Sequence, residues 1–122
     1  MSLKKAVMIV NDDTDLLNLF KNALDHERIG TIVFTNPTLA LEKIKTNPNQ
    51  FSLILINYAS QIKSSQRRFA KEVKEINNQI KVILTSGYNM DAENVSQGGF
   101  DRFLQLPVKL ADLVSIVKEM LG

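Results

Sequence analysis

The amino-acid sequence predicts a single α/β domain, residues 1–122, built on a doubly wound, five-stranded parallel sheet with helices on both faces. Three observations predict this class. Short apolar runs alternate with segments of helical periodicity along the whole chain. The apolar runs lack the polar alternation of half-exposed strands, as expected where helices cover both faces of a sheet. The length is common for one domain, and no interior stretch has the composition of a linker.

The first half of the chain contains three predicted strands and two predicted helices. The strands are Ala6–Val10, Thr31–Phe34 and Phe51–Ile56. The cap-rich segment Asn11–Asp15 precedes the first helix, and Gly30 is expected to close that helix or the loop after it. The apolar residues of this helix share one face: Leu16, Leu17, Phe20 and Leu24. Asn36–Pro37 opens a second helix, and Asn47–Pro48 ends it.

The second half continues the same alternation. Its predicted strands are Lys81–Thr85 and Arg102–Leu104. A helix is expected around Phe69, Val73 and Ile76, and a short one over 90–97 that Gly98–Gly99 ends. The final amphipathic helix carries its apolar residues at helical spacing: Leu110, Leu113, Val114, Val117 and Leu121.

Composition excludes several classes of function. Apolar residues make up 44% of the chain and charged residues 23%, which is typical of a globular protein. The chain has no cysteine, so disulfides and cysteine-based metal sites are excluded, and a reducing, cytoplasmic compartment is expected. The one histidine, His26, has no second histidine with which to share a metal and is expected near the end of the first helix. No apolar run reaches the ~18 residues of a membrane span.

The basic residues do not indicate a nucleic-acid site. The net charge is only +2, and the local run Gln66–Lys71 is more typical of a solvated helix face. Lys4–Lys5 do not begin a signal peptide, because the apolar run after them ends at the acidic pair Asp12–Asp13. Met1–Leu3 is interpreted as a remnant of an expression vector.

In a doubly wound parallel sheet, functional sites lie beyond the carboxyl ends of the strands. This rule selects a small set of residues: Asp12, Asp13, Asn57, Thr85, Ser86, Leu106 and Pro107. We expect these residues to gather at one edge of the sheet.

Several of these residues belong to motifs whose order resembles that of a known family. The motifs are the acids Asp12–Asp13, the apolar strand Phe51–Ile56, the turn Thr85–Tyr88, the segment Gly98–Asp101, and Pro107. Together they resemble response-regulator receiver domains of two-component signalling, over roughly Lys4 to Leu121. The resemblance implies the flavodoxin-like strand order 2-1-3-4-5.

The resemblance also implies a phosphoryl-acceptor site that this chain has altered. Receiver domains phosphorylate an aspartate after the third strand and use a lysine before the proline after the fifth strand. Asn57 occupies the acceptor position, and Leu106 occupies the lysine position. A neutral amide is not a carboxylate nucleophile, and a leucine side chain has no donor. Lys109 is expected to be a solvated residue and not a substitute for that lysine. The segment Tyr58–Gln61 also lacks the Met-Pro that usually follows the acceptor in this family. The chain therefore resembles a degenerate pseudo-receiver.

The acidic pair has two interpretations. By resemblance, Asp12 and Asp13 hold Mg²⁺, and a weak affinity for Mg²⁺ is expected to remain. Alternatively, one acid caps the first helix and the other is a favourable first-turn acid. Both interpretations can hold together.

The remaining site residues are assigned by the same resemblance. Ser86 is expected to be the switch hydroxyl, with Thr85 as the neighbouring candidate, although Ser86 could equally cap the turn that follows it. Phe103 corresponds to the switch aromatic, and its alternative is ordinary half-buried packing. The Leu106–Pro107 bond is a candidate for the cis form.

The leading functional hypothesis is a non-enzymatic pseudo-receiver that acts through protein contacts. The expected partners are a histidine kinase, a phosphotransfer protein or an output domain, and a homodimer could form through the face of the fourth helix, fifth strand and fifth helix. One alternative is phosphorylation on another residue, Ser60 or Ser86. Another is a ligand-binding or nucleic-acid module that reuses the fold, with Arg67, Arg68 and Lys71 as contacts.

Overall fold

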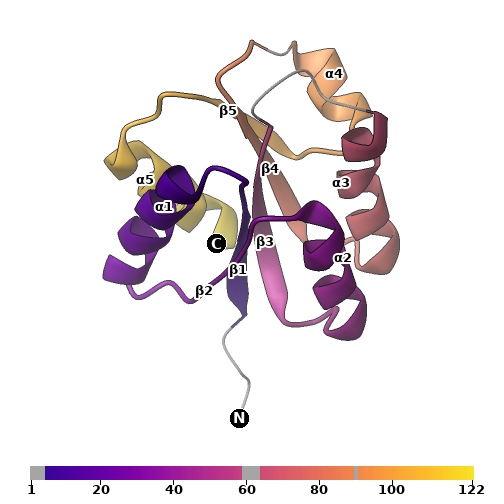
Figure 1. The fold of residues 1–122 in the computed structure, drawn as a ribbon, viewed down its shortest axis with the longest axis horizontal. Coiled ribbons are helices and arrows are strands. Elements are labelled where there is room, and N and C mark those ends of the chain that lie inside the picture. The colour runs from indigo at the N-terminus through magenta and orange to yellow at the C-terminus, as the bar shows by residue number, and fades with distance from the viewer. Residues whose placement is uncertain (1–4, 59–63, 90) are drawn as a thin grey trace.

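A computed structural model of the chain describes residues 5–58, 64–89 and 91–122, and the side chains of residues 64–67 lie outside this description. Within these ranges, five strands alternate with five helices (Figure 1). The strands are β1 (Ala6–Val10), β2 (Thr31–Phe34), β3 (Phe51–Asn57), β4 (Lys81–Ser86) and β5 (Arg102–Gln105). The helices are α1 (Thr14–His26), α2 (Pro37–Thr46), α3 (Ser64–Ile76), α4 (Ala92–Gln97) and α5 (Leu110–Leu121).

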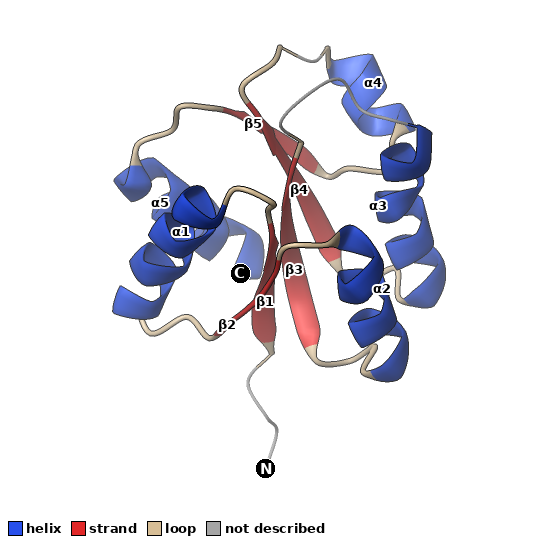
Figure 2. Ribbon diagram, viewed as in Figure 1, coloured by secondary structure: helices blue, strands red, loops and turns tan. Residues whose placement is uncertain are grey.

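The strands form one parallel sheet in the order β2-β1-β3-β4-β5, which confirms the predicted architecture (Figure 2). Because all the strands run in the same direction, their carboxyl ends lie along one edge of the sheet. Three strands end one residue later than the sequence predicts, at Asn57, Ser86 and Gln105. These residues pair across the sheet, Asn57 with Thr85 and Ser86 with Gln105.

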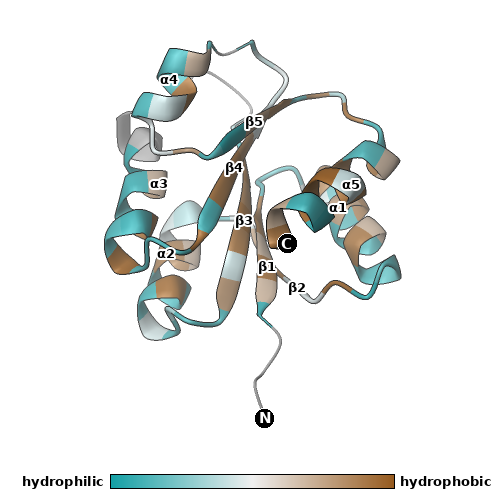
Figure 3. Cartoon of the chain, turned by 180° about the vertical axis from the view of Figure 1, so that it is seen from behind, coloured by the Kyte–Doolittle hydropathy of each residue, from teal (hydrophilic) through white to brown (hydrophobic). Residues whose placement is uncertain are grey.

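Helices cover both faces of the sheet. Helices α1 and α5 lie on one face, and α2, α3 and α4 lie on the other (Figure 1). Because successive side chains of a strand point to opposite faces, Val7 and Ile9 pack with the α1 and α5 side, whereas Met8 and Val10 pack with the other side. The strands are hydrophobic over most of their length, while the helices carry both kinds of residue (Figure 3). The two apolar layers therefore fix the sheet between its helices.

Local caps set the helix ends. Asn36 caps α2, whose first residue is Pro37, and Asp91 caps α4. Gly98 follows α4 as its C-cap, and Gly99 has a positive φ of 84°, a conformation that glycine adopts without strain. These boundaries confirm the predicted second helix and the end of the fourth.

Several smaller predictions have mixed outcomes. His26 is the last residue of α1, as expected, and Gly30 belongs to the loop before β2. Helix α4 begins at Ala92, so the predicted start at Met90 is wrong by two residues, because the side chain of Asp91 caps the helix there. Met90 itself and Met1–Leu3 lie outside the described residues. In the parts of the chain that the structure describes, no helix combines the length and hydropathy of a membrane span.

Candidate functional site

The carboxyl ends of β1, β3 and β4 bring three polar side chains together. Asn11 follows β1 directly and is only 2% exposed. Asn57 is the last residue of β3 and pairs with Thr85 of β4, which is 1% exposed. We call Asn11, Asn57 and Thr85 the strand-end cluster. The cluster lies where the sheet topology places a functional site.

A chain of hydrogen bonds joins the strand-end cluster. The Thr85 hydroxyl donates to Asn57 Oδ1 at 2.9 Å. Asn57 Nδ2 makes a long contact of 3.4 Å with Asn11 Oδ1. Asn11 Oδ1 also accepts the backbone N–H of Asp13 at 2.9 Å. The side chain of Asn57 is therefore held at both of its ends by uncharged groups.

The two acids predicted at this site do different things. Asp13 is the N-cap of α1, and its Oδ1 accepts the backbone N–H groups of Asp15 at 3.1 Å and Leu16 at 3.2 Å. This arrangement agrees with the capping interpretation for one of the two acids. Asp12 is exposed. The side chain of this segment that contacts Asn57 is that of Asn11, which the sequence analysis did not select.

A divalent cation such as Mg²⁺ is implied by the resemblance, and the strand-end cluster does not suit it. Mg²⁺ prefers several oxygen ligands, with carboxylates among them. Asn11 Oδ1 already accepts two N–H groups, which engages both of its lone pairs. Asn57 Oδ1 accepts the hydroxyl of Thr85. Within the described residues, no group of three or more acidic or histidine side chains could hold a metal ion.

The two switch-hydroxyl candidates face different partners. Thr85 is the one whose hydroxyl contacts Asn57. Ser86 is buried, donates to the backbone carbonyl of Tyr58 at 2.8 Å and accepts the backbone N–H of Tyr88 at 3.1 Å. Ser86 therefore stabilises the turn after β4, in line with the capping alternative. Ser60, the other alternative nucleophile, lies outside the described residues.

Leu106 follows β5 at the same edge of the sheet. Its backbone N–H donates to the carbonyl of Ser86 at 2.8 Å, and the Leu106–Pro107 peptide bond is cis. The Leu106 side chain is half-buried and packs against the core on the α1 and α5 side. Lys109 is the N-cap position of α5 and makes no side-chain cap bond. The position after β5 is therefore aliphatic in character.

Tyr58 anchors the chain just after β3. Its side chain is 1% exposed, and its ring meets that of Phe100 edge to face, with centroids 6.1 Å apart and an interplanar angle of 78°. Burial raises the pKa of the Tyr58 phenol well above its ordinary value, so this group stays neutral. The anchor fixes the backbone that carries Asn57.

Phe103 lies in β5 and is half-buried, with contacts to the core on the α2, α3 and α4 side. It also lines a shallow groove of about 420 Å³ between α4 and β5. The other residues that line the groove are Ala92, Val95, Ser96, Phe100 and Asp101. We call this surface the α4–β5 groove.

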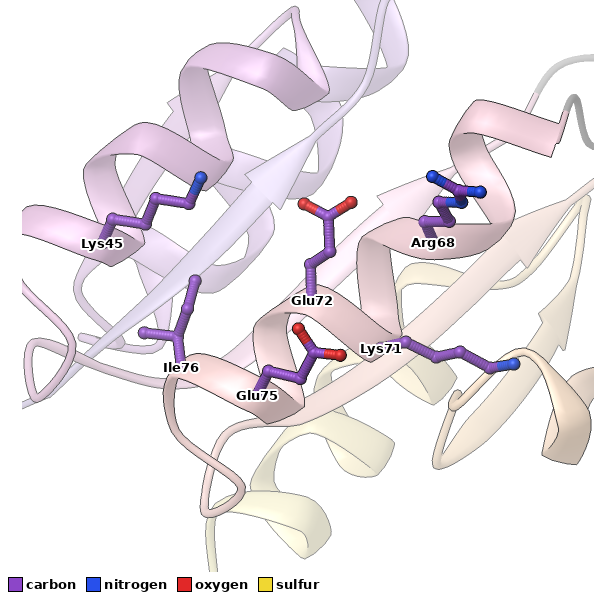
Figure 4. A pocket seen from close by; sticks show the side chains of 6 residues that line it. All are labelled: Lys45, Arg68, Lys71, Glu72, Glu75 and Ile76. Carbon is purple, nitrogen blue, oxygen red and sulfur yellow. The ribbon is translucent and has the colours of Figure 1, made fainter.

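A second hollow, of about 530 Å³, lies between α2 and α3 (Figure 4). Its lining residues are Lys45, Arg68, Lys71, Glu72, Glu75 and Ile76. Two glutamates therefore lie among the basic residues that the nucleic-acid alternative requires, and the side chain of Arg67 lies outside the described residues. This mixture of charges gives no basic surface for a phosphate backbone.

Comparisons with known proteins agree with this fold. No family model matches the chain. The chain is 26% identical over 114 residues to the two-component response regulator ARR21 of Arabidopsis thaliana. The aligned region covers 93% of this chain but only 18% of the length of that protein. It is 25% identical over 122 residues to the polar-differentiation response regulator DivK of Brucella anthropi, with 98% of each chain covered.

The solved structures give the same result. A CheY-like response regulator receiver domain protein of Methanospirillum hungatei superimposes with a TM-score of 0.82 and 26% identity, covering 98% of this chain and 94% of that one. The chain therefore has the receiver-domain fold of two-component response regulators. It is similar to these proteins over nearly its whole length.

Proposed function

We propose that this chain is a receiver-like domain of two-component signalling that takes no phosphoryl group at the end of β3 and acts through protein contacts. The observation that carries the proposal is the amide of Asn57, which is held in the neutral strand-end cluster. Receiver phosphorylation needs a carboxylate nucleophile and compensating positive charge. Asn57 supplies no carboxylate, and Leu106 supplies no cation.

The other hydroxyl at this edge gives little support to an alternative acceptor. The Ser86 hydroxyl is buried and already both donates and accepts a hydrogen bond. A nucleophilic hydroxyl needs a general base within hydrogen-bond reach, and the partners of Ser86 are two backbone groups. We therefore propose a non-enzymatic domain.

A surface groove supports the proposal that this domain acts through protein contacts. The α4–β5 groove presents the half-buried ring of Phe103 beside Val95 and Phe100. Apolar groups at a surface groove favour a protein partner. The expected partner is a histidine kinase, a phosphotransfer protein or an output domain in the cytoplasm, or a second copy of this chain bound through the same face.

The test is an intact-mass measurement after incubation with a small phosphodonor and Mg²⁺. The wild-type protein should gain no phosphoryl group, while a phosphorylatable receiver domain treated in parallel should gain one. An acid-labile adduct on the wild-type protein would overturn the proposal. A stable adduct mapped to a serine would instead support the alternative acceptor.

A further inference from the structure

The orientation of the Asn11 amide is fixed by the backbone. The N–H of Asp13 can only donate, so the Asn11 atom that lies 2.9 Å from it must be the oxygen. The orientation then extends to the next amide. Asn57 must present Nδ2 to Asn11 Oδ1, and this leaves Asn57 Oδ1 to accept the Thr85 hydroxyl. One backbone group therefore sets the direction of the whole chain of hydrogen bonds.

The same amide contributes a donor that disfavours positive charge. Asn11 Nδ2 is buried and has no hydrogen-bond partner among the described residues. An amide N–H₂ carries partial positive charge and cannot be a metal ligand. A cation at the strand-end cluster would therefore lie near a buried donor, and the oxygens of Asn11 and Asn57 are already engaged.

Asn11 also works against a carboxylate at position 57. A carboxylate oxygen in place of Asn57 Nδ2 would lie about as close to Asn11 Oδ1 as the 3.4 Å contact in the structure, and both atoms would be acceptors. Asn11 cannot relieve this repulsion by turning its amide, because Nδ2 would then face the N–H of Asp13. An aspartate at position 11 would keep the bond from Asp13 and supply a second charged oxygen ligand.

We infer that Asn11 and Asn57 act as one hydrogen-bonded unit that excludes divalent cations from the strand-end cluster. The inference deepens the proposed function and rests on it for its biological meaning. It assigns to Asn11 a positioning role: Asn11 orients Asn57 and removes the oxygen ligands that a cation would need. Replacing one amide should restore only weak cation binding, and tight binding should return when both amides are replaced.

The test measures Mn²⁺ binding by calorimetry, and the Mg²⁺-induced shift of the melting temperature, for matched variants. Wild type and the exposed-loop control Asn78→Asp should show neither signal. Asn57→Asp and Asn11→Asp should each bind weakly. The double variant should bind Mn²⁺ about tenfold or more tightly than either single variant. It supplies two carboxylate ligands, and a bound cation between them would relieve the repulsion between their oxygens.

Two results would overturn the inference: Mn²⁺ binding by the wild-type protein, or equal binding by Asn57→Asp and the double variant. If the double variant does not fold, Asn11→Ala combined with Asn57→Asp decides the question. Removing the opposing oxygen should then improve binding over Asn57→Asp alone, and no improvement would contradict the role of Asn11. A wild-type protein that binds Mn²⁺ but gains no phosphoryl group would overturn this inference and leave the proposed function intact.

Discussion

At the end of β3, the difference between an amide and a carboxylate is one charge and one pair of hydrogens. The amide of Asn57 donates toward Asn11 and accepts from Thr85, so it satisfies both neighbours without a counter-ion. A carboxylate in the same place would have only acceptor oxygens and would need a cation beside it. The choice between an amide and a carboxylate at position 57 therefore decides whether its neighbours must include a cation.

The hydroxyl of Thr85 should contribute measurable stability. Thr85→Val keeps the shape but removes the donor to Asn57 Oδ1, which leaves a partly buried oxygen without its partner. We expect a loss of about 1 kcal/mol in the free energy of unfolding, measured by urea denaturation. Thr38→Val, at an exposed position of α2, is the control and should change little. Equal stability of the Thr85 variant and the wild type would show that the bond contributes nothing.

Leu106 should limit phosphorylation once an acceptor is restored. Asn57→Asp should react slowly with a small phosphodonor and Mg²⁺, because no cation replaces the missing lysine. Adding Leu106→Lys should raise the rate about tenfold or more by stabilising the charge that develops on the phosphoryl group. Rates come from the time course of the intact mass. Equal rates with and without the second substitution would contradict the role assigned to Leu106.

At the scale of elements, the sequence predicted the starts of α1 and α2 because their caps are local. Asp13, Asn36 and Pro37 sit within a few residues of the helices that they start. Strand ends depend on pairing with other strands, so β3 and β4 each extend one residue beyond the prediction. The contact between Asn11 and Asn57 spans 46 positions in the sequence, so no local pattern predicts it. The rule that selects strand ends could have found Asn11, because Asn11 directly follows β1.

Asp101 links three elements and should matter for stability. Its Oδ2 accepts the backbone N–H of Val82 in β4 and the Nζ of Lys74 in α3, both at 2.7 Å, and Lys74 also donates to the carbonyl of Ile80. Asp101→Ala leaves a backbone donor and an ammonium without this partner. We expect a loss of about 1–3 kcal/mol in chemical denaturation.

The control for this prediction is Glu42→Ala, which removes an exposed acid from α2 and should change stability by less than about 0.5 kcal/mol. Similar effects of the two substitutions would mean that the link through Asp101 is no stronger than an ordinary surface charge.

The junction of α1 and β2 should contribute to acid sensitivity. Hydrogen bonds from Lys21 and then Thr31 lower the pKa of Asp25, which joins the end of α1 to the start of β2. The pKa of Asp25 is lower in the folded state than in the unfolded chain. Its stabilisation is therefore fully present at a pH above the pKa of the unfolded chain, and it is lost as the pH falls through the pKa of the folded state. The group is exposed, so the effect is small.

Unfolding free energies measured from neutral to acid pH test this sign. Asp25→Asn should make the free energy of unfolding depend less on pH on the acid side. In the wild-type protein, the unfolded chain protonates Asp25 at a higher pH than the folded state does. A profile with an unchanged slope would show that Asp25 does not couple to folding.

At the scale of the whole molecule, the fold followed from the sequence because its signal is repeated along the chain. Each apolar run is covered on both faces, and alternate residues of β1 enter opposite layers of the core. The resemblance to receiver domains supplied the strand order. Neither source could supply the direction of the hydrogen bonds in the strand-end cluster, because that depends on one backbone N–H at the start of α1.

The proposed function requires that the wild-type domain takes up neither a phosphoryl group nor a divalent cation at the end of β3. The most direct test is a ¹H–¹⁵N NMR spectrum of the wild-type domain before and after adding a small phosphodonor with Mg²⁺. We expect superimposable spectra, because Asn57 is not a carboxylate and the oxygens of Asn11 and Asn57 already accept hydrogen bonds. Specific shifts at Asn57, Thr85 and Phe103 would contradict it.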